Sequence, residues 1–527
     1  MLREIHPSLL VHKKITYLNM ERCTSLTTLP NQMHMESLRG LCLSSCYKLE
    51  KFPEIVGSMD CLLMMSLNST AIKGLPMSIE LLRGLQQFYL YDCKNLVSLP
   101  VTINGLKSLQ TLELRGCSKL DNLPETLGQV EKLSRLDVRG TAIRRPMASI
   151  FLMKNLVTLN FRGYKRPLAT SLSSLFLKTY RLPTLSGVCT SLTSLNLVDC
   201  NMEEGAIPND FFDSFPSLGS LELSKNNFVS LPGSINHLSK LHSLYLDGCK
   251  RLQSLPELPS KIRHIKVNGC VALETTSNAL RLCNSTLSIL SCVNCLKLIC
   301  CNNPASSMPR EFLKAMSKPT NRGRMHHQPI NEFKMVIPGS EIPKWFQHQS
   351  ETSSIKIERP PDSCDNKMVG YAVCCVFYVH EHQPTPSKGY YIGSHGIVCE
   401  LTNIDPLSEP WIQFENNLGK AVLDHLWLFY FCASTLNQDF VGLSFKSCGP
   451  GLEVKKCGIH PIYEKEIEEL KPRAKKSSSS SFWNSYELDE DFLGSMADVD
   501  CDGAEDADEI YFSADDELPK PKRLKSS

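Results

Sequence analysis

Leucine and other apolar residues recur through the first half of the chain in the pattern L-x-x-L-x-L-x-x-C/T/N, which further leucines and a proline follow. One copy contains Leu38, Leu41, Leu43 and Cys46. Copies begin at Ile15, Leu38, Leu62, Leu85, Leu109, Leu133, Leu156, Leu192, Leu218, Leu241 and Ile262, mostly 21 to 26 residues apart, with 36 between Leu156 and Leu192. A single unit of this length cannot bury its leucines, so the period predicts a solenoid that gains one short parallel strand and one return segment per unit.

A cysteine recurs at one position of the repeat. The residues concerned are Cys23, Cys46, Cys93, Cys117, Cys200, Cys249 and Cys270. A small side chain there packs beneath the turn after the strand, which favours a structural role over a metal or redox role. The chain has 23 cysteines in all, and its first residues do not form a secretory signal, which favours reduced thiols.

The first residues match the tail of a preceding repeat whose strand is missing. Leu2, Ile5 and Pro7 occupy the tail positions. An uncapped solenoid end would expose its hydrophobic face. We therefore expect a truncated first unit, which belongs to a longer protein or is covered by another chain.

The pattern changes after residue 273. Residues 274–332 are expected to form an exit segment and linker, and residues 333–465 contain short β-type runs separated by turn residues, which predict an antiparallel sandwich or jelly roll. Residues 466–527 are serine-rich and acidic and predict a disordered tail. The fold class is thus an α/β leucine-rich-repeat horseshoe over residues 1–273, with parallel strands on its concave face, followed by an all-β domain.

Net charge and sequence motifs give little support for binding of nucleic acid, membranes or metals. The net charge of +2 gives no drive toward nucleic acid or membrane, and no apolar run reaches the ~20 residues of a membrane span. Cys292 and Cys295 form a C-x-x-C pair, but their apolar neighbours favour core packing over zinc. The acidic run from Asp498 to Glu509 matches a calcium loop, yet Glu505 stands at its apolar position and no second loop follows. We predict no metal, no cofactor and no catalytic constellation.

Several phrases resemble one family. These are REIHPSLLVHKKITYLNMERCTSL, GCSKLDNLPETLG, NCLKL, VIPGSEIPKWFQHQS, MVGYAVCCVF, DHLWLFY and VKKCGIHPIY. They are similar to plant disease-resistance proteins of the TIR, nucleotide-binding, leucine-rich-repeat type, and those after the repeats to its jelly-roll/Ig-like domain. The resemblance implies the ligand-sensing and autoinhibitory part of an intracellular immune receptor, with a pathogen effector and the receptor's nucleotide-binding domain as partners.

The family's other domains do not extend to this chain. The phosphate loop G-x-x-x-x-G-K-[ST] is absent from the sequence, so NAD cleavage and nucleotide exchange are not expected here. Two alternatives stay open: a truncated decoy or regulator, and a generic repeat scaffold without receptor activity. The location expected is the cytoplasm, and basic clusters at Lys471–Lys476 and Lys520–Lys525 resemble nuclear-import signals.

Residues between and just after the strand leucines should face the concave side. They include Tyr89, Tyr91, Glu113, Arg115, Asp137, Arg139, Asn160, Arg162, Glu222, Tyr245 and Asp247. Arg115, Arg139 and Arg162 share one slot of successive repeats and predict a column of like charge, beside a second column from Glu113 to Asn160. This face is either a solvated, self-satisfied charged surface or a surface that binds a partner.

The motif after the repeats has two interpretations as well. It consists of Pro338, Gly339, Glu341, Trp345 and Phe346. A Pro-Gly turn followed by buried aromatic side chains is the first interpretation. The second is a loop surface that helps to hold the ligand.

Overall fold

The structure is a computed structural model that describes residues 2–143, 147–162, 181–275, 289–298, 334–358, 367–379, 395–401, 411–414, 423–432, 440–448 and 452–469. Of the tail predicted over residues 466–527, residues 466–469 belong to a helix, Glu464–Glu469. Residues 470–527 lie outside the described residues, and with them the calcium-like run and both basic clusters.

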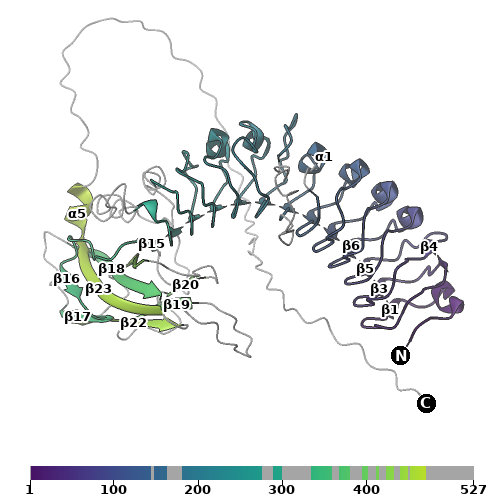
Figure 1. Cartoon of the computed structure of the whole chain (residues 1–527), viewed down its shortest axis with the longest axis horizontal. Helices are drawn as coiled ribbons and strands as arrows, with labels where there is room; N and C mark the ends of the chain where they lie inside the picture. The colour runs from purple at the N-terminus through teal and green to yellow at the C-terminus, as the bar shows by residue number, and fades with distance from the viewer. Residues whose placement is uncertain are drawn as a thin grey trace, which may run out of the picture. The chain divides into compact units, whose positions relative to one another are not determined.

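Each repeat contributes a short strand whose central residue is apolar. Neighbouring strands pair in parallel without a register shift, so Leu112 lies opposite Phe88 and Leu136. Figure 1 shows the strands following one another in sequence order. They are β1 (Tyr17–Asn19), β3 (Gly40–Cys42), β5 (Met64–Ser66), β6 (Gln87–Tyr89), β7 (Thr111–Glu113), β8 (Arg135–Asp137), β9 (Thr158–Asn160), β10 (Ser194–Asn196), β11 (Ser220–Glu222), β12 (Ser243–Tyr245) and β13 (His264–Lys266).

The return segments contain single helical turns, drawn in Figure 1 on the side opposite the strands. A proline precedes several of them, because its fixed φ suits the start of a helix and its missing N–H is not needed there. The turns are η1 (Pro7–Val11), η2 (Met77–Leu81), η3 (Val101–Gly105), η4 (Glu125–Gln129), α1 (Ala148–Phe151), η6 (Phe211–Ser214) and η7 (Gly233–His237). A small sheet of β2 (Gln32–Met33) and β4 (Glu54–Ile55) joins two early return segments.

A ladder of buried thiols runs along the repeats. The Sγ atom of Cys46 donates to the carbonyl of Met20 at 3.3 Å, and that of Cys117 donates to the carbonyl of Leu90 at 3.1 Å. Cys93, Cys249 and Cys270 repeat the contact. Each thiol thus satisfies a carbonyl of the preceding repeat, which is the structural role predicted for these cysteines.

The β domain is a sandwich of two antiparallel sheets. The first sheet has the order β15 (Lys334–Pro338), β21 (His425–Cys432), β18 (Met368–Val379), β23 (Leu452–Tyr463) and β16 (His348–Ser350). The second has the order β17 (Ser354–Glu358), β22 (Phe440–Cys448), β19 (His395–Leu401) and β20 (Trp411–Phe414). The helix α5 (Glu464–Glu469) follows β23. The segment Met368–Val379, long enough for two short strands, is one strand with two register shifts.

The parallel ladder continues past residue 273. A further strand, β14 (Ile289–Ser291), pairs with β13, and β15 of the sandwich pairs in parallel with β14. One face of the first sheet packs on the second sheet through Val373, Phe429 and Phe445. Its other face joins the hydrophobic cluster of the repeats. The sandwich therefore covers the end of the solenoid with a sheet that is buried on both faces.

Candidate partner-binding face

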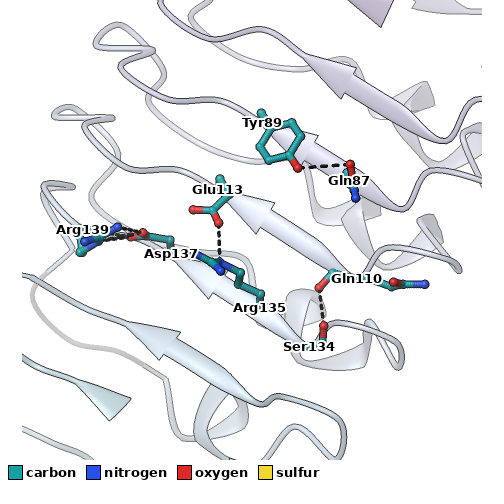
Figure 2. Close-up of polar contacts among 8 residues, drawn as sticks. All are labelled: Gln87, Tyr89, Gln110, Glu113, Ser134, Arg135, Asp137 and Arg139. Atoms are coloured by element: carbon teal, nitrogen blue, oxygen red, sulfur yellow. Dashed lines mark hydrogen bonds and ion pairs between the residues drawn. The ribbon is translucent and has the colours of Figure 1, made fainter. Parts of the chain in front are cut away.

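Four neighbouring strands, β6 to β9, place the central candidate residues side by side. Their register aligns Tyr89, Glu113, Asp137 and Asn160 in one row. Side chains two positions apart on a strand share a face, so Arg135 lies on this face together with Asp137. Figure 2 shows Tyr89, Glu113, Arg135 and Asp137 with their polar contacts.

The first ion pair joins two strands. Arg135 of β8 donates from Nε to Oε1 of Glu113 on β7 at 2.8 Å. The Glu113 side chain is only 3% exposed, whereas that of Arg135 is 54% exposed. Burial, with a smaller effect of Asp137, raises the pKa of Glu113 despite the nearby arginine. Its Oε2 has no hydrogen-bond partner within the part of the chain that the structure describes.

The second ion pair lies within one repeat. Arg139 donates to both oxygens of Asp137, from Nε at 2.9 and 2.8 Å and from Nη2 at 2.5 Å. Asp137 is fully buried and the Arg139 side chain is 31% exposed. The hydrogen bonds to Asp137 raise the pKa of Arg139 further above its ordinary value. This two-point contact fixes the direction of the guanidinium group.

Two tyrosines flank the ion pairs. The rings of Tyr89 and Tyr91 lie 6.0 Å apart, and the hydroxyl of Tyr89 donates to Gln87 Oε1 at 3.2 Å. Burial and the charge of Glu113 raise the pKa of Tyr89, and they raise that of Tyr91 to about 12. Both rings therefore offer neutral, half-buried surface beside the arginines.

The two predicted columns differ in the structure. The carboxylates of Glu113 and Asp137 are buried, so they contribute almost nothing to the exposed surface. Arg115 and Arg162 are exposed, and Arg139 is turned toward Asp137. Both acids are paired with arginines of the same face, as a self-satisfied charged surface requires, and binding of a partner at this face stays a prediction.

Sequence reasoning missed Arg135. It precedes the strand leucine, and the rule applied to the sequence took only positions between and after the leucines. Arg135 could have been found from the alternation of side chains along an extended segment, which places Arg135, Asp137 and Arg139 on one face.

The remaining predicted residues form a separate group. The strand register places Glu222 opposite Tyr245, and Lys266 next to Tyr245 with its Nζ 5.5 Å from the ring centre. Glu222 Oε1 accepts the backbone N–H of Ser224 at 3.2 Å, and burial raises the pKa of Glu222. Asp247 Oδ1 accepts the N–H of Asn268 at 2.8 Å. At ~4.8 Å per strand, β11 lies about 14 Å from β8, so the two groups are not in contact.

The motif after the repeats packs within the sandwich. Pro338 ends β15 and is buried, and the N–H of Gly339 donates to the carbonyl of Asp424 at 3.0 Å. Phe346 is buried, and Trp345 packs edge-on against His460 at 5.3 Å. Glu341 is exposed and lies 3.3 Å from Lys456. The motif thus contains the turn and the buried aromatic ring of the first interpretation.

Other site types have little support among the described residues. Within them, no cluster of three His, Cys, Asp or Glu side chains is placed to hold a metal. Cys295 donates its thiol to the Val267 carbonyl at 3.0 Å, as the repeat cysteines do. None of the helices seen in the described ranges has the length and apolar character needed to cross a membrane.

The chain matches known proteins in both of its parts. Residues 34–144 and 120–300 match the model of disease resistance protein RPS4B-like leucine-rich repeats, and residues 337–468 match the C-JID domain. Both models describe repeat and post-repeat regions, and neither describes a catalytic domain. The leucine-rich repeat domain of the type III effector XopL is 27% identical, with a TM-score of 0.32, and the match covers 39% of this chain and 69% of that domain.

Curated relatives are longer plant proteins. TMV resistance protein N of Nicotiana glutinosa is 34% identical over 380 residues, which are 71% of this chain and 31% of that protein. Disease resistance protein RPS4B of Arabidopsis thaliana is 26% identical over 475 residues, 85% of this chain and 34% of that protein. The chain therefore spans about a third of the length of these relatives. With a repeat match that covers about half of its residues and a C-JID match directly after it, this chain belongs to the RPS4B-like leucine-rich-repeat family of plant disease resistance proteins.

Proposed function

We propose that this chain is the sensing part of an intracellular plant immune receptor. In this proposal, the concave face binds a pathogen effector, and in the resting receptor it binds the receptor's own nucleotide-binding domain. The observation that carries the proposal is the match, in this order, to disease-resistance repeats and a C-JID domain. The named relatives are resistance proteins, which supports a role in defence.

The chemistry of the face supports binding of a protein. Arginine and tyrosine are enriched among the residues that dominate protein interfaces, and Tyr89, Tyr91 and Arg139 lie within three consecutive repeats. Their strands are held by a continuous buried core, so a partner would meet side chains that are already in place. The face therefore suits recognition of a folded protein surface.

The proposed location is the cytoplasm, with entry into the nucleus. The basic clusters at Lys471–Lys476 and Lys520–Lys525 support nuclear import, as clustered lysines and arginines do in import signals. A fluorescent fusion of the full chain should lose nuclear signal when the lysines of both clusters are changed to alanine. Equal nuclear signal in the two proteins would refute the import role.

Pull-down with the full chain tests the binding proposal. The chain is offered a panel of pathogen effectors and the nucleotide-binding domain of TMV resistance protein N. Changing Arg115 and Arg162 to Glu reverses two exposed charges and leaves both ion pairs intact. At up to ~1 kcal/mol per exposed charge, we expect affinity to fall about tenfold.

The matched control changes Lys107 and Lys132 to Glu. Both lysines are exposed in turns that precede β7 and β8, so the net charge changes equally. This control should bind like the wild type. The proposal is refuted if the wild-type chain captures neither kind of partner, or if the arginine variant binds as tightly as the control.

A further inference from the structure

On strands β7 to β9, positive groups are exposed and negative groups are buried. We call Arg115, Arg135, Arg139 and Arg162 the arginine row. Arg115 and Arg162 are exposed and Arg135 is 54% exposed, whereas Glu113 and Asp137 have side-chain exposures of 3% and 0%. A partner that approaches this face meets guanidinium groups and cannot reach the carboxylates.

The buried carboxylates hold the row in position. Glu113 binds Arg135 through Nε alone, which leaves both terminal nitrogens of Arg135 free of this contact. Asp137 binds Arg139 through Nε and Nη2, so Nη1 takes no part in the pair. A guanidinium group offers five N–H donors in a planar fork that matches a carboxylate. Fixed arginines lose less side-chain entropy when they bind an anion.

The row is short and has acidic boundaries. Asp92 is exposed in the turn after β6, and the half-buried Glu222 and Asp247 lie beyond β10. The strands β7, β8 and β9 are separated by two spacings of ~4.8 Å, which gives the row a length of about 10 Å. Half a spacing of side-chain reach at each edge extends this length to about 14 Å. Such a length suits three to five residues of an extended peptide, at ~3.3 Å per residue. A nucleic-acid site would need a longer basic track, because each phosphate contact adds only a part of the affinity.

We propose that the arginine row binds an acidic segment of a partner protein, a short run of Asp or Glu side chains. An apolar side chain next to that run would lie against Tyr89 and Tyr91, whose rings are half-buried beside the row. This inference rests on the proposed function, because it specifies the chemistry of the partner at the same face.

Fluorescence anisotropy with the full chain tests the proposal. The probes are a labelled oligoglutamate peptide that ends in leucine, an oligolysine peptide of equal length and an oligothymidine. We expect the oligoglutamate probe to bind most tightly and to be released by added salt. Changing Arg115 and Arg162 to Glu should weaken its binding about tenfold, and changing Lys107 and Lys132 to Glu should leave it unchanged.

A second variant guards against a folding defect. Changing Glu113 and Arg135 to Gln together removes one arginine of the row and leaves no unpaired buried charge, and should weaken oligoglutamate binding by about threefold. Equal affinity in both arginine variants and the wild type would overturn the proposal, as would tighter binding of oligolysine or oligothymidine. An effector that binds normally while the oligoglutamate probe does not bind would overturn this inference and leave the proposed function intact.

Discussion

His425 joins the repeats to the β sandwich through a bond that only its neutral form can make. The Nε2 atom of His425, at the start of β21, accepts the backbone N–H of Asn294, in the turn after β14, at 2.9 Å. An imidazolium has no free lone pair and would present a second donor. Burial lowers the pKa of His425 to about 4 from its ordinary 6.5.

This pKa shift sets the sign and size of a pH effect. The folded chain binds the proton less readily than the unfolded chain, so its stability is fully present above pH 6.5 and falls as pH decreases toward 4. A difference of about 2.5 units, at 1.36 kcal/mol per unit, corresponds to about 3 kcal/mol lost across this window.

Two measurements check the effect. Urea unfolding between pH 7 and pH 4.5 is compared for the wild type and His425→Gln, whose amide does not titrate. The free energy of unfolding of His425→Gln at each pH is subtracted from that of the wild type. The difference excludes titrating groups that both proteins share, including Glu113 and Glu222. Hydrogen exchange of residues 289–298, corrected for its intrinsic pH dependence, should show the same loss of protection in the wild type alone.

The comparison needs a histidine control. His348 is exposed in β16, and His348→Gln should retain the pH dependence of the wild type. A His425→Gln protein with the same pH dependence as the wild type would show that His425 is not the titrating group. Protection of residues 289–298 that stays constant down to pH 4.5 would show that the bond to Asn294 does not depend on the neutral imidazole.

Three further changes test the repeats by urea unfolding. Arg139→Ala should cost about 3 to 5 kcal/mol because it leaves the buried Asp137 carboxylate without its charged partner, and a loss below about 1 kcal/mol would contradict this role of the ion pair. Asn226→Ala should cost about 3 kcal/mol, since the Asn226 amide donates to the carbonyls of Leu197 and Leu223 and accepts the backbone N–H groups of Cys200 and Met202. Gly84→Ala should cost about 3 kcal/mol because its Cβ would clash with the backbone carbonyl of Asp60 in the preceding repeat. Gly74→Ala, with open space around it, should change stability by less than about 1 kcal/mol.

The repeats could be predicted from the period of the sequence because the same positions of each repeat are buried. Leu112 and Leu136 are buried and paired in register, as the L-x-L spacing requires. The strand β14 was missed because Cys292 stands where the pattern expects its second leucine. Leu290, Cys292 and Cys295 were the signal, at the spacing of Leu112, Leu114 and Cys117.

Side-chain partners at the candidate site were harder to predict. Strand alternation assigns Glu113 to a face, but it does not determine that Arg135 will cover the carboxylate, because that depends on rotamers across two repeats. The bond between Asn294 and His425 spans 131 residues of sequence, and no local pattern contains it. That the concave residues bind a partner stays a prediction.

The shared backbone pairing of β14 and β15 bears on how such receptors can be recombined. A chimaera cut between residues 298 and 334 would separate two strands that bond to each other and would leave Leu290, Cys292 and Met335 facing a foreign surface. A crossover inside the ladder, between two leucine-spaced strands such as β8 and β9, replaces one leucine-centred strand with another of the same spacing. New specificities are therefore best built by swapping inner repeats, with the last repeat and the sandwich inherited as one piece.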